Sequence, residues 1–174
     1  MSRLSRTIDD LLQLSRIEGD DDSPRELLGV ASVLAEAAAR ARSAADLHQI
    51  RLRVDAPAGL RLEADRRQLL SALVNLCDNA VKYSDDGAEV VLSARGVEGA
   101  VELSVADAGV GIPAADLERV FERFYRVDRA RSRDTGGTGL GLAIVRHVAQ
   151  NHHGTVTVRS REGEGTTFTM RLPL

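Results

Sequence analysis

The chain has 174 residues, the length of one ordinary domain with a modest addition. Hydrophobic residues make up 43% of it and aromatic residues only 3%, with no Trp, so we expect a globular protein with an aliphatic core. The net charge of -3 argues against a nucleic-acid partner, although arginines form a local run at Arg126, Arg129, Arg131 and Arg133. Cys77 is the single cysteine, which excludes an internal disulfide and favours a reducing compartment. No apolar run is long enough to cross a membrane, and no signal-peptide pattern follows Met1. We therefore expect a cytoplasmic chain that makes no membrane contact of its own.

The N-terminal segment, residues 1–18, has the pattern of an amphipathic helix that needs a partner. Its apolar positions fall near a heptad seam: Leu4, Ile8, Leu11 and Leu14 or Ser15. Gly19, three adjacent aspartates and Pro24 then interrupt the helix, which predicts a linker over residues 19–24.

The remaining residues, 25–174, predict one domain in which helices and strands mix without regular alternation. Helices are expected over 30–47, 65–83 with Asp65 as the cap, 113–121 and 139–152. Strands are expected over 50–57 and 60–64, in a central pair over 88–96 and 100–109, and in a closing hairpin over 154–174. The fold class is therefore α+β, a two-layer α/β sandwich whose mixed sheet is covered on one face by helices and preceded by the amphipathic helix.

The helix over 65–83 carries a polar stripe opposite its apolar arc. At about 100° per residue, Asn75, Asn79, Lys82 and Tyr83 share roughly one quarter of its circumference. A solvated surface usually carries Glu and Lys, whereas Asn is a poor helix former, so we interpret this stripe as functional. Amide oxygens suit a Mg²⁺ ion that keeps much of its water and bridges phosphate oxygens, and Lys82 can reach those phosphates.

A second motif follows the strand over 100–109. Its glycines, Gly109 and Gly111, imitate a dinucleotide-binding fingerprint, but the expected second parallel strand is absent from the charged segment that follows. Asp107 is better used as an acceptor for an exocyclic amino group such as that of adenine, with the glycines letting the ring lie against the backbone. A turn-capping role is the common alternative for this aspartate.

The third and fourth motifs bracket a long polar loop between Pro113 and Gly139, which suggests a lid over a ligand. Phe121 and Phe124 either anchor the hinge of this lid in an apolar slot or are plain core aromatics. The glycine segment that ends the loop offers backbone N–H groups and a helix start to a phosphate chain. Its residues are Gly137, Thr138, Gly139, Leu140 and Gly141.

Together, NLCDNAVKY, DAGVGIP, FERFYRVD and GGTGLGLAIV, followed by GEGTTFTMRLP, resemble the ATP-binding catalytic domain of two-component sensor histidine kinases. The wider superfamily includes gyrase, the heat-shock chaperone of ninety kilodaltons and MutL. The resemblance implies that Asn79, helped by Asn75, holds Mg²⁺, that Lys82 and Arg126 reach phosphate, and that Asp107 recognises adenine. It also implies that Tyr83 lines the site, that Thr166 adds a water-mediated contact to the base, and that the glycines shape the base pocket and close the lid.

The same resemblance favours phosphoryl transfer over hydrolysis, because the hydrolytic relatives place a glutamate base where this chain has Asn75. The amphipathic start resembles the second helix of the dimerisation and phosphoacceptor hairpin. The implied partners are the rest of that hairpin, a response-regulator receiver domain and a second copy in a full-length, membrane-anchored homodimer. The alternative is a nucleotide-binding docking module without catalytic output.

None of the four histidines stands in an acceptor pattern such as HELRTP. We interpret His48, His147, His152 and His153 as structural or surface residues, with the last two at a helix end where a cation would suit the dipole. The phosphoacceptor is therefore expected outside this chain.

Overall fold

The computed structural model describes residues 2–127 and 136–174, and its centre is a mixed sheet of five strands in the order β2-β4-β5-β7-β6. The strands are β2 (Arg51–Asp55), β4 (Glu89–Val97), β5 (Ala100–Asp107), β6 (Thr155–Arg161) and β7 (Gly165–Pro173). β2 runs parallel to β4, and every other pair is antiparallel. The predicted central pair, β4 and β5, and the closing hairpin, β6 and β7, are confirmed.

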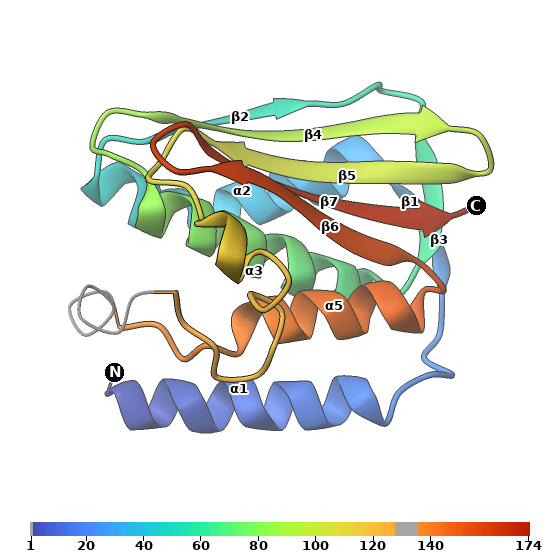
Figure 1. Ribbon diagram of the computed structural model, residues 1–174. Helices are drawn as coiled ribbons and strands as arrows, with labels where there is room; N and C mark the ends of the chain where they lie inside the picture. Colours follow the sequence, from blue (N-terminus) through green and yellow to red (C-terminus); the bar gives the residue numbers. More distant parts are fainter. Residues whose placement is uncertain (1, 128–135) are drawn as a thin grey trace.

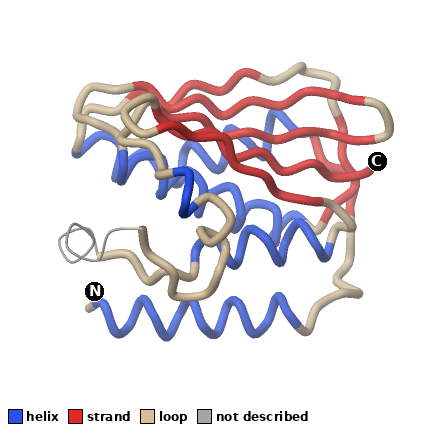
Figure 2. Tube along the Cα trace, in the orientation of Figure 1, coloured by secondary structure: helices blue, strands red, loops and turns tan. Residues whose placement is uncertain are grey.

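Helices cover one face of this sheet, as predicted. They are α2 (Val30–Leu47), α3 (Arg66–Tyr83) and α5 (Gly141–Asn151), which form a layer beneath the strands (Figure 1). The tube view shows the same two layers, and no helix of the described residues lies on the outer face of the sheet (Figure 2). In the described part of the chain, every helix is too short or too polar to span a lipid bilayer.

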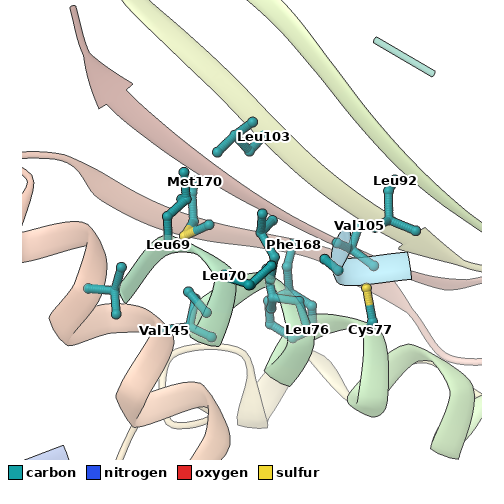
Figure 3. Packing of buried hydrophobic residues seen from close by; sticks show 14 of the residues in the cluster. Leu69, Leu70, Leu76, Cys77, Leu92, Leu103, Val105, Val145, Phe168 and Met170 are labelled. Atoms are coloured by element: carbon teal, nitrogen blue, oxygen red, sulfur yellow. The ribbon is translucent and has the colours of Figure 1, made fainter. Parts of the chain in front are cut away.

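The core lies between these layers and is aliphatic. From α3, Leu69 lies beside Met170 of the sheet and Cys77 points toward Val105 (Figure 3). Phe121 joins this core and meets Phe168 edge to face, with ring centroids 5.9 Å apart. Phe124, by contrast, is 55% exposed, so the idea that an apolar slot holds it is wrong.

The N-terminal helix α1 (Arg3–Glu18) lies along α5 on the side away from the sheet (Figure 1). Leu14 and Ile17 are buried against the domain, whereas Leu4, Ile8 and Leu11 of the expected seam stay exposed. At its C-terminal end, Glu18 contacts Arg123 and His147, two residues of different segments of the domain.

Two elements differ from the sequence-based expectation. A short strand, β1 (Glu26–Gly29), pairs antiparallel with β3 (Arg61–Ala64) in a separate two-stranded sheet. These four residues close after a proline are too few to show a strand pattern in the sequence. The strand forms because it pairs with β3, which is distant in the sequence. The helix expected over 113–121 is only a 3-10 turn, η1 (Ala114–Asp116), followed by further turns. Because the chain must bury Val120 and Phe121 and then return toward Gly139, it cannot continue as one helix.

A polar contact fixes the start of α3 to the end of α5. His152 is buried, its Nε2 accepts from the Asp65 amide at 3.0 Å, and its Nδ1 lies 2.7 Å from the Val148 carbonyl oxygen. This pattern requires the neutral imidazole with its proton on Nδ1. Burial lowers the pKa of His152, although its bond to the Val148 carbonyl opposes the shift, so the expected helix-end cation is wrong at this position.

Candidate functional site: a polar helix face beneath a glycine segment

The polar stripe of α3 forms because the opposite side of the helix is fully used by the core. Asp65 caps the helix by accepting from the Gln68 amide at 3.1 Å, which fixes where the first turn begins. The side chains of Asn75, Asn79 and Lys82 stay partly exposed, on the side away from Cys77. The stripe therefore faces the segments that precede α5 rather than the sheet.

Asn75 lies directly against the first residue of α5. Its Nδ2 donates to the Ser71 carbonyl at 2.9 Å, which orients the amide. A Cβ atom placed on Gly141 would lie 2.9 Å from Asn75 Oδ1, so the backbone of Gly141 approaches the amide oxygen closely. A larger residue at 141 would displace one of these two partners. Asn79 follows one turn later on the same face.

Lys82 lies against Gly137, where a Cβ atom would collide with its ammonium group. Arg126 lies beside the same glycine, with Nη2 3.7 Å from that Cβ position. The ammonium also sits over the Tyr83 ring, 5.3 Å from its centroid. The structure thus brings together four of the predicted residues, which come from α3 and from both flanks of the polar loop.

Positive charge is concentrated around Lys82. Burial, as the largest cause, and the neighbouring cations Arg126, Arg6 and Arg3 together lower the pKa of this lysine to about 8. Arg3 and Arg6 come from α1, so the N-terminal helix contributes to the field of the site. Mutually repelling cations in a partly desolvated position fit an anionic ligand such as a polyphosphate.

The glycine segment is positioned by its neighbours at both ends. Gly139 has φ +76° and accepts from the Phe124 amide at 2.9 Å, and its Cα packs on the Phe124 backbone. A side chain there would be strained in conformation and would collide with that backbone. Thr138 donates to Asp10 of α1 at 2.5 Å and accepts from the Leu140 amide at 3.3 Å. Leu140 is buried as a whole residue, and its side chain belongs to the hydrophobic core.

The loop after β5 is held against the end of α3. Asp107 Oδ1 accepts from the Gly109 amide at 2.9 Å, and the Val110 amide donates to the Tyr83 carbonyl at 3.2 Å. Gly109 packs on that carbonyl, and Gly111 packs on the backbone of Arg161. Burial raises the pKa of Asp107, whereas backbone N–H groups of Gly109 and Thr166 act in the opposite direction. The turn-capping bond leaves other lone pairs of the carboxylate available, so it does not conflict with the predicted acceptor role.

Thr166 faces Asp107 across the pairing of β5 with β7 and is 7% exposed. Both residues line a cavity of about 450 Å³ between the β6–β7 hairpin and Leu117. Ser160 of β6 lines the same cavity and bonds the Thr166 hydroxyl at 2.8 Å. Sequence reasoning missed Ser160, although the hairpin register about Gly163 places it opposite Thr166. A second cavity, of about 560 Å³, lies at the linker beside Asn151, away from the polar stripe.

The metal-binding prediction depends on amides rather than on a cluster of charged ligands. Within residues 2–127 and 136–174, no group of three or more His, Cys, Asp or Glu side chains is placed to hold a metal ion. Asn75 and Asn79 offer neutral oxygens that fit Mg²⁺ bound chiefly by phosphate and water. Of the predicted arginine run, Arg129, Arg131 and Arg133 lie outside the described residues, together with the rest of residues 128–135 of the predicted lid.

Comparison with known proteins agrees with this geometry. Residues 64–174 match the family model described as histidine kinase-, DNA gyrase B-, and HSP90-like ATPase. The chain is 48% identical over 172 residues to the sensor-like histidine kinase SenX3 of Mycolicibacterium smegmatis, which covers 98% of this chain and 45% of that protein. It is 40% identical over 174 residues to the sensor histidine kinase WalK of Bacillus subtilis, covering 98% of this chain and 28% of that protein. The chain thus spans less than half the length of these relatives.

Solved structures give the same result. The mycobacterial sensor histidine kinase MprB superposes with a TM-score of 0.74 at 30% identity, covering 86% of this chain and 97% of that one. Full-length ShkA in complex with AMPPNP superposes with a TM-score of 0.83 at 28% identity, covering 98% of this chain and 35% of that one. Because the family model spans most of its residues, this chain belongs to the histidine kinase-, DNA gyrase B-, and HSP90-like ATPase family.

Proposed function

We propose that this chain is the catalytic, ATP-binding part of a sensor histidine kinase. It binds Mg-ATP and transfers the γ-phosphoryl group to a histidine outside this chain, from which an aspartate of a response-regulator receiver domain receives it. The observation that carries the proposal is the meeting of Lys82, Arg126 and Gly137 beside the amide face of α3. A cationic, partly desolvated site under a glycine backbone suits a triphosphate.

The proposed roles follow from where the side chains lie. Asn79, with Asn75, would hold Mg²⁺, which would neutralise charge on the phosphates. Lys82 and Arg126 would bind and orient the phosphate chain, and the backbone of residues 137–141 would cover it. Asp107, Gly109, Gly111 and Thr166 would form the base pocket, with Tyr83 at its edge. The bound ligand of ShkA, AMPPNP, is an adenine nucleotide analogue and supports this choice of base.

Asn75 supports transfer rather than hydrolysis. Its amide cannot take a proton from water at neutral pH. We therefore expect little phosphate release from the chain alone.

The proposed domain organisation assigns residues 1–18 to the second helix of a phosphoacceptor hairpin, 19–24 to a linker and 25–174 to the catalytic domain. Leu14 and Ile17 pack against the domain, which supports a structural coupling between α1 and the site. The complete protein would be a membrane-anchored homodimer with this part in the cytoplasm.

The test is transfer of label from γ-labelled ATP to a separately prepared hairpin that carries the acceptor histidine. Acid-labile, base-stable label on the hairpin is expected with the wild-type chain and with Cys77→Ala, but not with Asn79→Ala. Tight ATP binding without any transfer would favour the docking module instead. Sustained phosphate release by the chain alone would indicate a hydrolytic ATPase.

A further inference from the structure

Ser160 lies where three hydrogen bonds meet at the wall of the cavity beside Asp107. Its Oγ donates to the Gly165 carbonyl at 2.8 Å and accepts from the Ile112 amide at 2.7 Å. The third partner is the Thr166 hydroxyl, also at 2.8 Å. The serine therefore joins β6, the start of β7 and the glycine loop after β5.

Counting protons fixes the direction of the third bond. A serine hydroxyl has one proton and two lone pairs. The Gly165 carbonyl can only accept, so it takes the proton, and the Ile112 N–H occupies one lone pair. The remaining lone pair is all that Ser160 can offer to Thr166, so Thr166 donates its only proton to Ser160. The Thr166 oxygen is thereby left with lone pairs and no proton for any further partner.

The strand register places this oxygen beside Asp107. Asp107 pairs with Thr166, and Thr166 pairs with Ser160, so the three side chains form a row across β5, β7 and β6 on the helix-facing side of the sheet. All three line the same cavity of about 450 Å³. Burial raises the pKa of Asp107, and backbone N–H groups of Gly109 and Thr166 directed at the side chain oppose that shift. In its carboxylate form the side chain can only accept. Two acceptors therefore stand side by side on the cavity wall.

We propose that Ser160 is a positioning residue that sets the base preference of the nucleotide site, by holding Thr166 as an acceptor next to Asp107. Such a wall favours a purine with a 6-amino group, which has hydrogens to donate, and disfavours a 6-carbonyl group, whose lone pairs meet lone pairs. The inference rests on the proposed function, since it requires the base to lie against this wall.

A purely structural role would leave a different signature. If Ser160 had no effect on Thr166, it would only hold the Ile112 segment against the hairpin. Its loss would then weaken the binding of every nucleotide to the same extent. Ser104 provides a matched control, because its hydroxyl makes a 2.8 Å cross-strand bond to Thr169 in the same sheet without lining the cavity.

The experiment compares Mg-bound ATP, purine riboside triphosphate and inosine triphosphate, which carry an amino group, a hydrogen and a carbonyl at position 6. Affinities are measured by competition for the wild type, Ser160→Ala, Ser160→Thr and Ser104→Ala, with the melting temperature of each variant as a check on folding. The wild type should bind ATP most tightly and inosine triphosphate least tightly. In Ser160→Ala, Thr166 can turn its proton toward the carbonyl, so the preference for ATP over inosine triphosphate should fall by about tenfold. Ser160→Thr, which keeps the hydroxyl, and Ser104→Ala should retain the wild-type preference.

An unchanged ratio in Ser160→Ala, or an equal loss for all three nucleotides, would overturn the inference while leaving the proposed function intact. A wild type that binds no purine triphosphate would overturn both. If Ser160→Ala does not fold, the order of the nucleotide affinities in the wild type is the test. Equal affinities for inosine triphosphate and purine riboside triphosphate would contradict a cavity wall that only accepts hydrogen bonds.

Discussion

The hydroxyl of Thr138 donates to Asp10 Oδ2 across 2.5 Å, and this bond connects the N-terminal helix to the glycine segment beside Lys82. The same carboxylate raises the pKa of Asp78, after burial as the larger cause, so its negative charge is felt on the α3 side as well. A triphosphate at this site would meet that charge. We therefore expect α1 to influence how tightly nucleotide is held.

Replacing Asp10 by Asn keeps an oxygen for Thr138 but removes the charge. We expect Asp10→Asn to tighten Mg-ATP binding by about two- to fivefold at low salt, the size of an exposed charge interaction, and the gain should shrink as salt is added. Asp9→Asn is the matched control, because Asp9 is the exposed neighbour on the same helix. Equal effects of the two variants would contradict a specific role for Asp10.

Lys82 should make nucleotide binding depend on pH. Its pKa is about 8 in the free protein, and a bound triphosphate would raise it, so between these two values binding takes up a proton. ATP affinity should therefore fall as pH rises through 8, by about tenfold between pH 7 and 9. Calorimetry in buffers of different ionisation enthalpy would measure the proton uptake. Lys82→Arg should bind with little change over this range, because its guanidinium stays charged. The same pH profile in both proteins would show that another group titrates.

His152 should limit stability in mild acid. The pKa of His152 in the folded state lies below its ordinary value near 6.5. The unfolded chain therefore binds a proton more readily than the folded chain, and the free energy of unfolding decreases as the pH falls through 6.5. Burial, as the largest cause, and the charges of Arg25 and His153 oppose protonation, whereas the bond to the Val148 carbonyl and the charge of Asp65 favour it. The free energy of unfolding in urea at pH 7.5 and 5.5 would show the loss. His153→Gln should keep this dependence, and His152→Gln should reduce it. An NMR titration placing the His152 pKa at or above 6.5 would contradict the buried neutral ring.

Asp107→Asn should selectively weaken the binding of ATP. The amide oxygen can still accept from the Gly109 amide, but its NH₂ group then faces the amino group of adenine in a partly buried pocket. We expect about a tenfold to hundredfold loss of ATP affinity with little change in melting temperature. The exposed Asp85→Asn is the control. ATP binding that is unchanged in Asp107→Asn would show that this carboxylate does not read the base.

Prediction from sequence worked where a pattern is repeated along an element. The apolar arc of α3 and the alternation in β4, β5 and β7 each give several consistent residues, so both layers of the sandwich were predictable. The polar stripe is recognisable because Asn is a poor helix former and is uncommon on an ordinary exposed helix surface. The sequence of this one helix therefore suffices to identify its residues.

Features that depend on tertiary contacts were not predictable in the same way. β1 exists because β3 pairs with it, and the turns after Pro113 exist because Phe121 must reach Phe168. His152 looked like a helix-end cation, but its burial against Asp65 depends on how α3 and α5 pack. Arg6 and Asp10 joined the site only because α1 folds back along α5, a relation that no local motif encodes.

The most direct measurement is a calorimetric titration of ATP into the chain, with and without Mg²⁺, for the wild type, Asn79→Ala and Cys77→Ala. Cys77 lies on the same helix but is buried in the core, so its change to Ala should cost about 1–2 kcal/mol of stability and leave binding intact. We expect Mg²⁺-dependent binding at a single site in the wild type and in Cys77→Ala, and its loss in Asn79→Ala. No binding by the wild type, or the same Mg²⁺-dependent binding in Asn79→Ala, would contradict the claim that the amide face of α3 holds the nucleotide.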